Sequence, residues 1–129
     1  MKRRPLMRAA GVASLLLLAA TSAPAAEADV ERGKVKFQRT CAPCHAAGPG
    51  DDGRTMLPGT AALQLKYKGT VPALLEARAD LPAAVLRTFV RRGSWSMPPF
   101  RKTELSDAEI DDIAAYLAAS SKSGARSAR

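Results

Sequence analysis

Apolar residues recur at helical spacing in three stretches of this chain, and no stretch alternates apolar and polar residues as a half-buried strand would. The clearest stretch lies near the C-terminus, where Ser106 and Glu109 form a capping box after the apolar Leu105. Its apolar face consists of Ile110, Ile113, Ala114, Tyr116 and Leu117. This pattern predicts a helix over residues 106–119.

A second helix is predicted over residues 29–40, because apolar or small residues there lie three or four positions apart. They are Val30, Gly33, Phe37 and Cys41. Glycine in a helix interior costs about 1 kcal/mol relative to alanine. A close approach by another helix would explain why position 33 carries glycine.

A third helix is predicted to begin near Asp80 as its N-cap, with Pro82 in the first turn, and to end at Gly93. Before it, the segments LQLKYKG and VPALLEARA indicate only short helical turns. Residues 46–60 and 94–100 contain repeated glycine or proline and are predicted to be loops. The fold class expected from these elements is all-α.

The first 25 residues follow the order of a secretory signal peptide. A basic start precedes an apolar run over residues 9–20 and a small-residue stretch that ends at Ala25. The apolar run is shorter than the about 20 residues that a membrane-spanning helix needs. We therefore predict export to the periplasm without membrane insertion after cleavage, a folded domain over residues 26–120, and a disordered basic tail over residues 121–129.

The formal net charge of +8 is unevenly placed. Without the four cations of the signal segment, 16 basic and 12 acidic side chains remain, which gives +4. Residues 54–102 hold nine cations and two carboxylates, whereas residues 27–31 and 104–112 together hold eight carboxylates. Nucleic-acid binding needs a concentrated basic face with readout elements, so that class is excluded. The segregation predicts instead an acidic partner that docks on the basic side.

The pentapeptide CAPCH at residues 41–45 contains both cysteines of the chain, Cys41 and Cys44, and its only histidine, His45. A structural zinc site needs four ligands, and the chain has three such residues. A thioredoxin-like redox pair needs a βαβ pattern, which is absent here. A simple disulfide is possible in an oxidising compartment, but it gives His45 no role.

Cys-x-x-Cys-His is the attachment motif of covalent c-type haem. The two thiols would form thioethers with the vinyl groups, and His45 would bind the iron as an axial ligand. After the signal segment the chain has two methionines, Met56 and Met97, that could serve as the second axial ligand. Pro98 and the proline after it stiffen the segment of Met97, which favours Met97, with Met56 or an open position as the alternatives.

The sequence from residue 29 to 119 resembles monohaem class I cytochromes c of the bacterial periplasm. The resemblance is carried by the haem motif, Met97 and four further residues: Gly33, Phe37, Tyr116 and Leu117. It implies one covalent haem c within a small helical fold, terminal helices that cross at Gly33, and a proline whose carbonyl supports His45. Pro58 matches that proline by its distance, with Pro49 as the alternative.

The function expected from these features is one-electron transfer between periplasmic redox proteins, without enzymatic activity of its own. Trp95 and Tyr67 are candidates for packing against the haem. Short segments such as LKYKG and MPPFRKTELSDAEI resemble cytochrome subunits of flavoprotein dehydrogenases, which implies a dehydrogenase as electron donor and an oxidase or another cytochrome as acceptor. The alternatives are a fixed subunit of a flavocytochrome complex and a peroxidase-like haem enzyme with a displaceable methionine.

Overall fold

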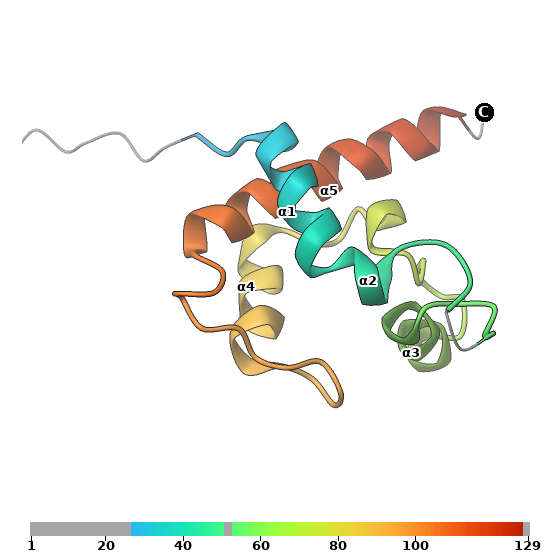
Figure 1. Cartoon of the computed structure of the whole chain (residues 1–129). Coiled ribbons are helices and arrows are strands. Elements are labelled where there is room, and N and C mark those ends of the chain that lie inside the picture. The colour runs from blue at the N-terminus through green and yellow to red at the C-terminus, as the bar shows by residue number, and fades with distance from the viewer. Residues whose placement is uncertain (1–26, 51–52, 128–129) are drawn as a thin grey trace, which may run out of the picture.

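The computed structural model describes residues 27–50 and 53–127, so the predicted signal segment lies outside the described residues. The described chain forms five α-helices and one short 3₁₀ helix (Figure 1). They are α1 (Val30–Thr40), α2 (Ala42–His45), α3 (Pro58–Tyr67), η1 (Leu75–Ala77), α4 (Ala83–Arg92) and α5 (Asp107–Ser127). Over these residues the only β-type pairing is an isolated bridge, which confirms the all-α prediction.

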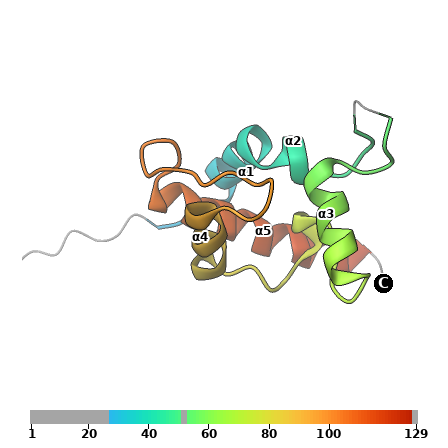
Figure 2. The ribbon, with the colours of Figure 1, turned by 90° about the horizontal axis from the view of Figure 1, so that it is seen from below.

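Helices α1 and α5 cross in close contact near Gly33 (Figures 1 and 2). A Cβ atom at Gly33 would lie 2.0 Å from the backbone oxygen of Asp112. The rings of Phe37 and Tyr116 lie on the same interface, with centroids 5.4 Å apart. The predicted crossing at Gly33 is therefore confirmed, and the contact explains the glycine at this position.

Polar contacts fix the angle of this crossing. The buried carboxylate of Asp112 accepts two hydrogen bonds from the Arg32 guanidinium, both at 3.0 Å, and a third at 2.7 Å from the backbone N–H of Asp29. Lys36 and Glu109 add an ion pair of 2.5 Å one turn away. Each partner comes from the opposite helix or its cap, so the contacts hold one relative orientation of α1 and α5.

The core lies between α1, α4 and α5, and its fully buried side chains are Phe37, Leu105, Ile110 and Leu117. Ser106 and Glu109 form the predicted capping box, because the backbone N–H of Ser106 donates to Glu109 at 2.7 Å and that of Glu109 donates to the Ser106 hydroxyl at 3.2 Å. The N-terminal boundary of α5 was therefore predicted from local chemistry alone.

The predicted end of this helix near Ala119 is wrong, because α5 continues to Ser127 and includes most of the segment predicted as a disordered tail. Adding residues to a helix already fixed by packing avoids the unfavourable nucleation step. Ser121 and Ser123 donate to the carbonyls of Ala118 and Ala119, which is compatible with the helix. Residues 128 and 129 lie outside the described part of the chain.

The start of α4 also differs from the prediction. Asp80 does not cap this helix, whose N-cap is Pro82. The Asp80 carboxylate instead accepts two hydrogen bonds from the buried Arg78, at 2.8 and 2.6 Å. Gly93 ends α4 as predicted, at a φ of 68°. None of the helices in the described ranges is long and apolar enough to cross a membrane.

Candidate haem-binding site

The CAPCH segment forms one turn of helix at the end of α1. Cys41 caps α1, and its carbonyl accepts from the backbone N–H of Cys44 at 3.1 Å and from that of His45 at 2.9 Å. Residues three and four apart on a helix are neighbours on its surface. The turn therefore brings both thiols and the imidazole to one face, which is the arrangement that attachment of a planar group through two sulfurs and a nitrogen needs.

The two thiols differ in their surroundings. Cys41 is half-buried beside the core, Cys44 is exposed, and both are free. Burial raises the pKa of the Cys41 thiol to about 11, with a smaller contribution from the neighbouring Cys44. The Cys41 thiol is therefore protonated at neutral pH.

The His45 imidazole is partly buried, and its Nδ1 atom is fully enclosed without a hydrogen-bond partner in the described residues. Burial lowers the pKa of His45 below its ordinary value, so the ring is neutral at neutral pH. A neutral imidazole is the form that binds a metal. When one ring nitrogen faces the protein, the other is left for the metal, and the enclosed atom here is Nδ1. The donor set of two thiols and one imidazole thus fits a c-type haem.

The first turn of α3 lies against this imidazole. A Cβ atom at Gly59 would fall 2.7 Å from the Cε1 atom of His45 and 2.8 Å from its Nδ1 atom. Pro58 directly precedes this glycine and begins α3. Pro58 thus adjoins the residue next to the ring, but His45 Nδ1 has no hydrogen-bond partner among the described residues, so support through the proline carbonyl stays a prediction. Sequence reasoning missed Gly59, because residues 46–60 were predicted as loop, whereas α3 begins at Pro58, and the contact with His45 forms only in the fold.

Met97 stands in a tight turn between α4 and α5. The backbone groups of Ser94 and Met97 exchange two hydrogen bonds, of 3.0 and 2.9 Å. A Cβ atom at Gly93 would lie 2.6 Å from the Met97 carbonyl. The Met97 side chain is half-buried and packs against the core. In both views the segment between α4 and α5 extends toward α2 and α3 (Figures 1 and 2).

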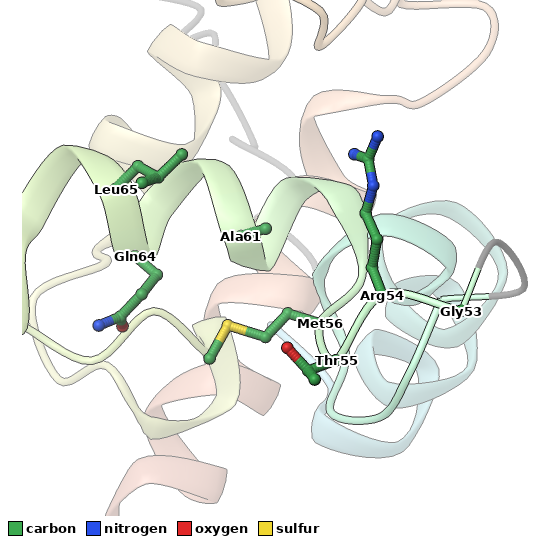
Figure 3. Close-up of a pocket in the computed structure, with 7 residues that line it drawn as sticks. All are labelled: Gly53, Arg54, Thr55, Met56, Ala61, Gln64 and Leu65. Carbon is green, nitrogen blue, oxygen red and sulfur yellow. The ribbon is translucent and has the colours of Figure 1, made fainter.

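Met56 has different surroundings. It lines an open groove of about 460 Å³ between the preceding loop and α3, with its side chain near that of Gln64 (Figure 3). The other lining residues are Gly53, Arg54, Thr55 and Ala61. Leu65 is 78% exposed and Met56 is 37% exposed. The structure therefore groups Met56 with an outward-facing surface of α3, whereas Met97 belongs to the packed part of the chain.

The two aromatic residues predicted to pack against the haem differ in position. The Tyr67 ring lies 5.0 Å from the guanidinium carbon of the buried Arg78 and 5.3 Å from the Lys66 ammonium. Trp95 is fully exposed at the tip of the Met97 turn, with a φ of 54°. Neither the surroundings of Tyr67 nor the exposure of Trp95 tests haem packing, so this role stays a prediction for both residues. Arg78 was missed because no local pattern distinguishes a buried arginine from an exposed one.

Comparisons with known proteins identify relatives of the whole domain. The family model described as "Cytochrome C oxidase, cbb3-type, subunit III" matches residues 28–117. Cytochrome c6 of Cyanidioschyzon merolae is 33% identical over 97 residues, which cover 75% of this chain and 80% of that protein. Cytochrome c6 of Bumilleriopsis filiformis is 31% identical over 97 residues, which cover 75% of this chain and 98% of the relative. The solved cytochrome c6 of the diatom Phaeodactylum tricornutum matches with a TM-score of 0.45 and 30% identity, over 74% of this chain and 98% of that one.

Proposed function

The chain belongs to the cytochrome c family and carries a covalently bound haem c, and we propose that it is a periplasmic one-electron shuttle with His45 and Met97 as axial ligands. The haem, when bound, supplies the Fe(III)/Fe(II) couple. The observation that carries the proposal is the CAPCH turn, which presents two free thiols and a partly buried imidazole with an enclosed Nδ1 atom on one face. Cys41 and Cys44 would hold the porphyrin edge and His45 the iron.

The Met97 turn supports the second ligand. Its two backbone hydrogen bonds and the close packing at Gly93 hold the segment in one conformation. A ligand held in this way needs little rearrangement on oxidation or reduction, which suits electron transfer. A thioether ligand also raises the reduction potential relative to a second histidine, and no second histidine exists in the chain.

The single histidine also bears on the choice between carrier and enzyme. A peroxidase-like site needs a distal acid–base group in addition to the proximal ligand. With His45 assigned to the iron, no histidine is left for that task. Electron transfer requires no such group, so the carrier is the function that these residues support best.

Redox proteins are the partners of a haem c electron carrier, and we propose a dehydrogenase as the donor. The short segments that resemble cytochrome subunits of flavoprotein dehydrogenases support this choice. The fully exposed Trp95 beside Met97 is also compatible with a protein partner that covers this turn.

The experiment that tests the proposed shuttle uses the full chain expressed with its N-terminal segment in a bacterium that assembles c-type cytochromes. The periplasmic protein should contain one haem that acidified acetone does not extract, and a redox titration should show a single reversible one-electron wave. His45→Ala should lose the low-spin spectrum. Extractable haem, or an unchanged spectrum in His45→Ala, would contradict the proposal. Mass spectrometry of the same sample should place the mature N-terminus near residue 26.

A further inference from the structure

We infer that Gly59 and Thr60 are positioning residues for His45: together they form a seat that fixes the orientation of the imidazole through the first turn of α3. The inference rests on the proposed function, because it concerns the residue assigned as the histidine ligand. It goes beyond the supporting proline, since it assigns separate roles to two residues after Pro58.

Gly59 supplies the space for the ring. A Cβ atom there would lie 2.7 Å from the Cys44 carbonyl oxygen and 2.7 Å from the Cε1 atom of His45. Both distances are shorter than side chains tolerate, and one of the opposing atoms belongs to the backbone. Glycine is not required by the local conformation, because φ at position 59 is not positive. Gly48, Gly53 and Gly69 show the opposite case, with positive φ and no neighbour within 4 Å of a Cβ.

Thr60 links α3 to the segment of the haem motif through a hydrogen bond. Its side chain is only 4% exposed, and its hydroxyl donates a hydrogen bond of 3.1 Å to the carbonyl of Ala46. Ala46 directly follows His45, and its backbone N–H donates to the Ala42 carbonyl at 3.0 Å. The hydrogen bond therefore links α3 to the residue that directly follows the CAPCH turn, fourteen positions earlier in the chain.

Both contacts restrict the orientation of the His45 imidazole. The thioether and backbone bonds place the Cα atom of His45, but they leave the ring free to turn about its side-chain torsions. Gly59 lies against the Cε1 and Nδ1 atoms and limits that rotation. Because the Nδ1 edge faces α3, Nε2 is the nitrogen left for the iron. Residues that orient a ligating histidine commonly change metal affinity or activity by about 10–100-fold when they are replaced.

The test compares Gly59→Ala with two matched glycine replacements in the holoprotein. Gly33→Ala introduces an even closer clash, 2.0 Å from the Asp112 oxygen, at a distance from the haem motif, and Gly124→Ala meets nothing within 4 Å. Gly59→Ala should shift the reduction potential and convert part of the low-spin haem to a high-spin form. Gly33→Ala should lower stability with no such shift, and Gly124→Ala should match wild type in both measurements.

Thr60→Val keeps the shape of the side chain and removes only the hydrogen bond. It should produce the same spectral change as Gly59→Ala to a smaller extent, whereas Thr60→Ser, which retains the hydroxyl, should restore the wild-type potential.

The inference is overturned if the spectrum and potential of Gly59→Ala equal those of wild type, or if Gly33→Ala changes them to the same degree. Failure of the proposed function looks different, because His45→Ala would then keep the wild-type low-spin spectrum.

Discussion

At the scale of single residues, the function depends on a few side chains whose chemistry is set by burial. The Nδ1 atom of His45 is enclosed and the imidazole is neutral, while Cys41 is half-buried and Cys44 faces solvent. One helical turn brings all three residues together through its backbone hydrogen bonds, and the first turn of α3 then lies against the His45 ring.

The two cysteines should contribute unequally to haem attachment. Cys41→Ser places a hydroxyl beside the core and removes one thioether, whereas Cys44→Ser removes the thioether at an exposed position. Both variants should give much less covalent haem than wild type, and Cys41→Ser should also lower the denaturation midpoint. Haem staining after denaturing electrophoresis and urea melts would measure the two effects. Equal stability of the two serine variants would contradict the assigned burial.

At the scale of elements, the pairing of α1 with α5 organises the molecule. The contact at Gly33, the aromatic pair beside it and the Arg32–Asp112 hydrogen bonds lie on one interface. The carboxylate of Glu76 in η1 accepts a hydrogen bond from the Tyr116 hydroxyl, which connects η1 to α5. Because α2 continues directly from α1, this pairing also positions the haem motif relative to the core.

Gly33→Leu should destabilise the fold strongly. A Cβ atom alone would meet the Asp112 backbone oxygen at 2.0 Å, so the helices must separate, and overpacking of this kind typically costs about 1–3 kcal/mol. Urea denaturation of the holoprotein would measure the loss of unfolding free energy. Gly124→Ala, in the open part of α5, should be neutral or slightly stabilising. A neutral Gly33→Leu would mean that the two helices do not cross there.

Asp107 at the start of α5 should contribute to acid sensitivity. Hydrogen bonds from Arg91 at 2.6 Å and from Lys102 at 2.9 Å hold the pKa of Asp107 at about 2, below its ordinary value of 3.8. A carboxylate with a lowered folded-state pKa stabilises the fold above its unfolded pKa, and this contribution is lost as pH falls toward the folded pKa. Wild type should therefore lose more stability than Asp107→Asn between about pH 4 and pH 2. Parallel pH profiles of the two proteins would refute this role.

At the scale of the whole molecule, the charge is less segregated than the sequence indicated. Arg87 and Arg91 from the basic stretch pair with Asp107 or Asp111 on α5, and Lys102 pairs with Asp107. Arg101 likewise pairs with Glu104. The predicted basic side is thus partly neutralised within the molecule. Lys66, Lys68 and Arg92 are exposed, and none of them forms an ion pair with another described residue.

Electron transfer with the physiological partner should therefore depend on Lys66 and Lys68 more than on Arg101 and Lys102. The double variant Lys66→Glu, Lys68→Glu should slow the reaction at low salt, and the difference from wild type should shrink at high salt as the Debye length falls to about 3 Å at 1 M. Stopped-flow kinetics would measure both rates, with Arg101→Glu as the matched control. Rates that change with neither salt nor charge reversal would instead indicate an apolar contact centred on Trp95.

Sequence patterns predicted the features that depend on local chemistry. Ser106 and Glu109 specify the start of α5. Gly33 predicted the helix crossing, because glycine inside a predicted helix costs stability and a close approach by another helix would explain it. The seat at Gly59, the buried Arg78 and the length of α5 were not predicted. The first two depend on segments distant in sequence that meet only in the fold, and the length of α5 depends on packing that fixes its first turns.

The central claim is ligation by His45 and Met97, and the weak far-red charge-transfer band of ferric haem with a thioether ligand tests it most directly. Oxidised wild type should show this band. Met97→Ala should lose the band and lower the reduction potential, while Met56→Ala, whose side chain lines the outward-facing groove on α3, should keep both. Loss of the band in Met56→Ala with retention in Met97→Ala would contradict the account.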